Sequence, residues 1–172
     1  MPSPSRSGSG KGKTVAFLGV MLSLSLVMAY IETFITLPFT IPGVKIGLAN
    51  IITLMLLYQS GWKQALTVGV LRVILSGFLF GSLFGILFGM TGMVLSLIVM
   101  SVTKGCGRFS VRGVSMAGGV SHNIGQIIAA LVVTETPGVI WYLPALLVAG
   151  LVMGGINGVL AGLVLPYLKK ME

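Results

Sequence analysis

Acidic residues are nearly missing from this chain: it has no aspartate, and only three glutamates occur among its 172 residues. Charged residues of both signs make up 8% of the chain and hydrophobic residues 55%, whereas a soluble domain carries roughly 25% charged residues. This deficit excludes an ordinary water-soluble globule and indicates a protein of the lipid bilayer. So apolar a chain also excludes general disorder.

Cysteine and histidine each occur once, as Cys106 and His122. A lone cysteine excludes a disulfide framework and a CxxC metal site, and the scattered glutamates supply no cluster of metal ligands. The segment SGSGKGKT resembles a phosphate loop, but Ser7 stands where that motif needs glycine and no buried strand precedes it. We therefore expect no metal, no cofactor, no nucleotide site and no catalytic residue in this chain.

The net charge of +8 is the feature that could indicate binding to nucleic acid. The basic residues, however, separate apolar runs and do not line one face of a domain, as a nucleic-acid-binding surface requires. We expect the lipid bilayer, and not a nucleic acid, as the partner.

Six apolar runs are long enough to be predicted as membrane-spanning helices. They cover roughly residues 14–36, 45–60, 63–82, 84–103, 112–134 and 143–167. The run 45–60 is short, since at about 1.5 Å per residue it reaches about 24 Å, less than the ~30 Å hydrocarbon core. The pattern predicts an all-α, polytopic membrane protein built as a six-transmembrane-helix bundle.

The basic residues also predict the orientation, because cytoplasmic loops carry an excess of lysine and arginine. With the amino terminus in the cytoplasm, the following residues are cytoplasmic: Arg6, Lys11, Lys13, Lys63, Lys104, Arg108, Arg112, Lys169 and Lys170. We predict a multi-pass protein of the cell membrane with both termini cytoplasmic. Its segments are a disordered tail over 1–13, a single six-helix domain over 14–168 and a C-terminal tail over 169–172.

Small residues recur every fourth position in several of these runs. Such stripes let two helix backbones approach closely, where van der Waals packing replaces the missing hydrophobic drive. They serve either packing within the bundle or docking of a partner membrane protein, and the sequence leaves both open. The residues that we assign to this role are Gly19, Ser23, Gly150, Gly154 and Gly158.

The segment SHNIGQ places three strongly hydrogen-bonding side chains inside an apolar run. At about 100° per residue, His122, Asn123 and Gln126 fall within an arc of about 100° on one helix face. In a bilayer these groups must face the bundle interior or a water-filled cavity. They either brace neighbouring helices or contact a ligand.

Arg72 lies near the middle of the third run. An arginine inside the membrane is costly and by default marks a functional site. Its charged guanidinium suits a carboxylate or a phosphate. The alternative is a structural ion pair with Glu32, which could equally pair with Lys45.

The segment LPFTIPGVKIGLANI contains Pro38, Pro42 and Gly43, which break a helix. The following helix is therefore expected to start below the membrane surface and to present free amide donors at its amino terminus. Lys45 and Asn50 would add a charge and an amide there, as in the anion sites of transporters. Lys45 could instead extend to the outer headgroups. Asn157, in the last run, is a weaker candidate.

PGVKIGLANI followed by SHNIGQIIAA resembles the signatures of a family of bacterial membrane proteins. It is the heptaprenyl diphosphate synthase component I family, also called the Gx transporter family, and the resemblance covers about residues 14–168. That family is in turn similar to the substrate-binding S components of energy-coupling-factor (ECF) transporters. The resemblance implies an outward-facing pocket, docking through small residues of the first helix, and an ECF-type membrane scaffold subunit with ATPases as partners.

The name of this family suggests a synthase, but prenyl chain elongation needs Mg²⁺ held by clustered aspartates. This chain has no aspartate, so it does not fit that activity by itself. The resemblance to S components implies instead a subunit that captures a small anionic, vitamin-like or isoprenoid-type ligand for uptake, and this is the expected function. The alternative is an accessory membrane subunit of heptaprenyl diphosphate synthase in isoprenoid and quinone metabolism. A purely structural membrane anchor, in which the polar groups only brace the bundle, is a third possibility. The residues expected to bind the ligand are Lys45, Asn50, Arg72, His122, Asn123 and Gln126.

Overall fold

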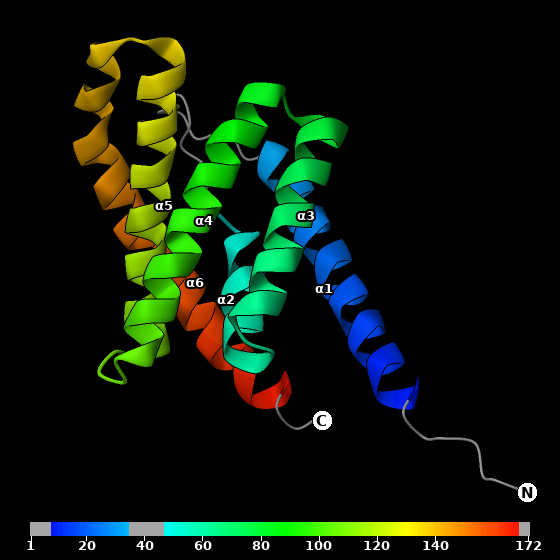
Figure 1. The fold of residues 1–172 in the computed structure, drawn as a ribbon. Coiled ribbons are helices and arrows are strands. Elements are labelled where there is room, and N and C mark those ends of the chain that lie inside the picture. The colour runs from blue at the N-terminus through cyan, green and yellow to red at the C-terminus, as the bar shows by residue number, and fades with distance from the viewer. Residues whose placement is uncertain (1–7, 35–46, 169–172) are drawn as a thin grey trace, which may run out of the picture.

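A computed structural model describes residues 8–34 and 47–168, and these residues form an all-helical bundle (Figure 1). The all-α fold class is thereby confirmed. The α-helices are α1 (Gly8–Phe34), α2 (Asn50–Gln59), α3 (Trp62–Phe80), α4 (Leu83–Gly105), α5 (Val111–Thr134) and α6 (Leu143–Leu168), with a 3-10 helix η1 (Pro137–Tyr142) before α6.

Five of the described helices, all except α2, are long and apolar enough to cross a membrane. This supports a multi-pass membrane protein, but six full spans are not confirmed. The predicted span 45–60 corresponds to α2, whose 10 residues reach about 15 Å, half of the ~30 Å core. Gly47, with φ +74°, is in the left-handed region just before α2, so the apolar run is not helical from its start.

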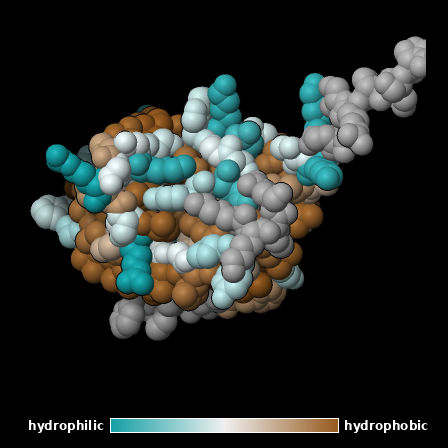
Figure 2. Space-filling model, turned by 90° about the horizontal axis from the view of Figure 1, so that it is seen from below, coloured by the Kyte–Doolittle hydropathy of each residue, from teal (hydrophilic) through white to brown (hydrophobic). Residues whose placement is uncertain are grey.

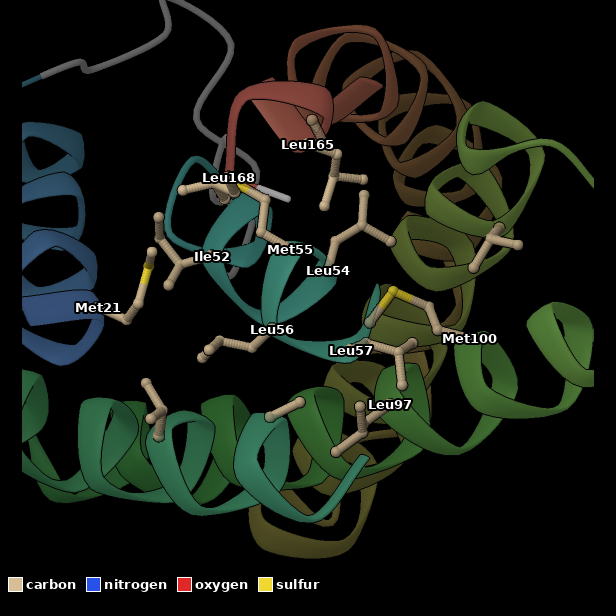
Figure 3. Packing of buried hydrophobic residues seen from close by; sticks show 14 residues of the cluster. Met21, Ile52, Leu54, Met55, Leu56, Leu57, Leu97, Met100, Leu165 and Leu168 are labelled. Carbon is tan, nitrogen blue, oxygen red and sulfur yellow. The ribbon is translucent and has the colours of Figure 1, made fainter. Parts of the chain in front are cut away.

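The hydrophobic core surrounds α2, whose residues from Ile52 to Leu57 are all buried. A helix that is apolar on every side is stable only when other helices enclose it, and α1, α3, α4, α5 and α6 all contribute residues to this core (Figure 3). The cluster consists of Met21, Ile52, Leu54, Met55, Leu56, Leu57, Ala65, Val68, Leu97, Met100, Val114, Ala161, Leu165 and Leu168.

Two hydrogen bonds fix the carboxyl end of α2 to the ends of α4 and α6. Lys104 Nζ donates to the Leu57 carbonyl at 2.6 Å and lies 4.8 Å from the Tyr58 ring centroid. Gln59 Nε2 donates to the Leu168 carbonyl at 3.2 Å. The carboxyl end of α2 is therefore at the end of the bundle where α4 and α6 finish, and its amino end points toward the middle.

The start of α1 and the end of α6 lie at that same end of the bundle (Figure 1). Figure 2 views the molecule from this side and shows hydrophilic side chains among the apolar ones. Exposed cations of the described residues at helix ends here are Lys11, Lys13, Lys63, Arg108 and Arg112. This distribution agrees with the predicted cytoplasmic side, which itself stays a prediction. The helix α1 begins at Gly8, inside the predicted tail 1–13, because a helix can continue in water beyond an apolar segment.

Glycines let α5 approach both of its neighbours at backbone distance. A methyl group at Gly125 would lie 2.8 Å from the Thr91 carbonyl oxygen of α4, and one at Gly150 would lie 2.7 Å from the Gly119 carbonyl oxygen of α5. Such distances leave no room for any side chain, so both crossings require glycine. The close crossings place the SHNIGQ face of α5 between α4 and α6.

Candidate functional site

A partly open cavity of about 50 Å³ lies at the amino end of α2. It can hold a few water molecules, since one needs roughly 10–15 Å³ of such space. Residues of α1, α2, α3, α5 and α6 line it, together with Gly47 just before α2. The lining residues are Glu32, Gly47, Asn50, Arg72, Gly119, His122, Asn123, Ala149, Gly150, Met153, Gly154 and Asn157.

Four of the six residues predicted to bind a ligand line this cavity, namely Asn50, Arg72, His122 and Asn123. Gln126, one helical turn beyond His122, is buried but does not belong to the lining. Lys45 lies outside the described residues. The structure thus brings together side chains from α2, α3 and α5 that are far apart in the sequence, while ligand binding itself stays a prediction.

Arg72 is the cation of the cavity wall among the described residues. It is half-buried on α3, and its Nε atom is enclosed without a hydrogen-bond partner in the described part of the chain. Glu32, which lines the same cavity, attracts it electrostatically. Both the ion-pair alternative for Arg72 and donation from its guanidinium to a ligand stay predictions.

Two asparagines of the cavity wall also hold the backbone in place. Asn123 Nδ2 donates to the Leu146 carbonyl of α6 at 2.6 Å, and Asn157 Nδ2 donates to the Gly47 carbonyl at 2.8 Å. Asn123 therefore has the bracing role considered for the polar stripe. Asn50 differs from both, because its Oδ1 is buried without a hydrogen-bond partner among the described residues.

His122 lies on the side of the cavity that α4 approaches. A methyl group at Gly92 would lie 2.9 Å from both Nδ1 and Cε1 of His122. The imidazole therefore fits against α4 because residue 92 is glycine.

Two lining residues, Glu32 and Gly47, form hydrogen bonds that the sequence did not predict. Glu32 is half-buried near the end of α1 and accepts a hydrogen bond from the Leu48 amide, while the sequence suggested only an ion-pair partner. Gly47 carries the carbonyl that Asn157 holds. One signal in the sequence pointed to Glu32: it is the acidic residue that falls within a predicted span.

The predicted stripes of small residues fall into two groups. Gly150, Gly154 and Gly158 are buried and contact the α5 backbone closely enough that a methyl group would meet it within 2.7 Å. Gly19 and Ser23 of α1 are exposed, and nothing would touch a methyl group at Gly19. The α6 residues thus lie at an internal helix contact, whereas docking through Gly19 and Ser23 stays a prediction.

Among the described residues, no group of three or more histidine, cysteine, aspartate or glutamate side chains could hold a metal ion. The chemistry available in the cavity is a guanidinium, a carboxylate, an imidazole and several amides. Such a set binds and orients a polar or anionic group.

The family described as heptaprenyl diphosphate synthase component I matches residues 21–164, which is most of the chain. No curated protein and no solved structure was found to match. The matched segment runs from α1 to α6 and contains every described residue that lines the cavity. From this match, the chain belongs to the heptaprenyl diphosphate synthase component I family.

Proposed function

We propose that this chain is an accessory, non-catalytic membrane subunit of a heptaprenyl diphosphate synthase system, and that its cavity holds the anionic head of an isoprenoid-type ligand. The observation that carries the proposal is Arg72, whose enclosed Nε has no hydrogen-bond partner in the described part of the chain and which lines a cavity with Asn50. A partly buried cation with spare donor capacity suits a phosphate or diphosphate oxygen.

The catalytic step would belong to a partner. A diphosphate leaving group needs Mg²⁺ held by carboxylates, and this chain has no aspartate. The family's printed description, a numbered component of a synthase, supports assembly with a second, catalytic component. The role of the membrane subunit would be to hold the ligand at the bilayer, where its apolar tail is soluble.

A second candidate is an S-component-like uptake subunit that captures a small anionic ligand from outside. It is favoured by where the cavity lies, at the amino end of α2, whereas the carboxyl end of α2 bonds to Lys104 and Leu168 near the basic side. On the predicted orientation, the cavity is therefore separated from the cytoplasm by α2 and its core.

Arg72→Ala tests the binding site that both candidates share. We expect it to weaken binding of an isoprenyl diphosphate to the detergent-purified protein by at least tenfold, because hydrogen bonds to charged groups contribute about 1.5–3 kcal/mol. Arg72→Lys should recover part of the affinity, since it keeps the charge but loses the planar fork. Arg108→Ala is the matched control, because Arg108 is exposed in the connection between α4 and α5. Equal affinity of Arg72→Ala and wild type would contradict the site.

Co-expression with a soluble prenyltransferase separates the two candidates. An accessory subunit should raise the rate or the chain length of the product, and Arg72→Ala should lose that effect. An uptake subunit should leave product formation unchanged and should increase accumulation of its ligand when ATPase partners are present.

A further inference from the structure

Glu32 places a carboxylate in the wall of the cavity, on a backbone amide. It is half-buried near the carboxyl end of α1, and its Oε1 accepts a hydrogen bond from the Leu48 amide. Arg72 lines the same cavity. The Glu32 carboxylate thus has a backbone donor and shares its cavity with a guanidinium.

The Leu48 amide is held in this position from the other side of its peptide group. The Gly47 carbonyl accepts from Asn157 Nδ2 at 2.8 Å and from the Asn50 amide at 2.9 Å. With its carbonyl fixed by two donors, the Gly47–Leu48 peptide directs its N–H toward the cavity. The donor is therefore preorganised for an anion, whichever molecule supplies it.

Charge balance explains why the protein would keep a carboxylate there. An uncompensated arginine within a membrane protein is costly, and pairing with an opposite charge lowers that cost. The described charged residues of the cavity wall are Glu32 and Arg72, whose charges cancel. If the carboxylate moves away, an incoming anion can neutralise Arg72 instead.

We propose that Glu32 is a built-in substitute for the ligand, whose carboxylate holds the anion position on the Leu48 amide, in the cavity that Arg72 also lines, until an oxyanion head displaces it. This inference rests on the anion site of the proposed function and adds to it a competition within the protein. It also defines the ligand class: a phosphate, diphosphate or carboxylate head small enough to replace one carboxylate in a cavity of about 50 Å³.

Glu32→Gln tests the competition, with inorganic diphosphate as the probe and calorimetry on the detergent-purified full chain as the measurement. The substituted side chain would still accept from the Leu48 amide but without a charge, so we expect the affinity for diphosphate to rise about tenfold or more. Glu135→Gln is the matched control, because it removes the same charge from an exposed position outside the cavity. It should leave the affinity unchanged.

Glu32→Asp distinguishes displacement from simple repulsion between charges. The shorter side chain keeps the negative charge but draws the carboxylate away from the Leu48 amide, so displacement predicts an affinity above that of wild type. Repulsion alone predicts no change, and that result would overturn the inference.

Arg72→Ala in the same calorimetric assay separates the anion site itself from the competition by Glu32. If it abolishes binding while Glu32→Gln leaves the affinity at or below the wild-type value, the anion site stands and Glu32 is not its competitor. If diphosphate binds to neither wild type nor Glu32→Gln, both the substitute and the anion site are wrong.

Discussion

At the scale of single residues, the polar side chains of α5 differ in what holds them. Asn123 Nδ2 has a partner in the Leu146 carbonyl, whereas Gln126 Oε1 is enclosed without one among the described residues. Removing a satisfied buried group leaves its partner unpaired, while removing an unsatisfied one costs little. An apolar substitution at Asn123 is therefore expected to lower the stability of the protein, whereas one at Gln126 is not.

Asn123→Leu is expected to lower the free energy of unfolding by about 1–2 kcal/mol, because the Leu146 carbonyl loses its side-chain donor. Gln126→Met should leave the stability unchanged or raise it. Apparent melting temperatures in one detergent provide the comparison. Gln126→Met should also leave ligand affinity unchanged, because Gln126 does not line the cavity. A larger loss of stability for Gln126→Met than for Asn123→Leu would contradict this assignment.

At the scale of helices, the contact between α5 and α6 depends on glycine at a four-residue spacing. Gly154 and Gly162 both belong to this four-residue series of glycines in α6, but their surroundings differ. A methyl group at Gly154 would lie 2.6 Å from the Ser115 carbonyl oxygen of α5, while nothing lies within 4 Å of one at Gly162. Alanine substitutions at these two positions therefore separate the effect of the contact between α5 and α6 from the higher helix propensity of alanine.

Gly154→Ala is expected to destabilise the protein by about 1–3 kcal/mol, because backbone atoms of α5 would have to move. Gly162→Ala should be neutral or stabilising by up to about 1 kcal/mol, since alanine forms helices better than glycine. Thermal unfolding of the two variants side by side measures the difference. Similar stabilities for both would mean that α5 and α6 can separate without cost.

At the scale of the whole molecule, the distribution of basic residues predicts which end is cytoplasmic. Cys106 is exposed between α4 and α5, at the basic end. In intact cells, a membrane-impermeant maleimide should not label it until the membrane is permeabilised. Thr136→Cys in a Cys106→Ser background is the control, because Thr136 is exposed before η1 at the other end of α5. It should react in intact cells, and the reverse pattern would contradict the orientation.

The apolar pattern of the sequence predicts the helical class and the limits of α3 to α6 to within about two residues, whereas α1 begins six residues before its predicted start. The runs 112–134 and 143–167 correspond to α5 (Val111–Thr134) and α6 (Leu143–Leu168). Such agreement has a physical reason: inside a bilayer each segment must satisfy its backbone hydrogen bonds alone, so an apolar run of sufficient length is a helix wherever it packs. The short α2 departs from the prediction because Gly47 is in the left-handed region before it.

Which polar residues share the cavity depends on how the helices pack against one another. Asn50, Arg72 and His122 come from three helices, and their meeting depends on how each helix is rotated and where it crosses its neighbours. Those crossings are set by glycine contacts such as Gly125 against Thr91, which no periodicity within one segment specifies. For the same reason Gln126, on the predicted polar face, lies outside the cavity, while the Leu48 amide next to Glu32 became visible only in three dimensions.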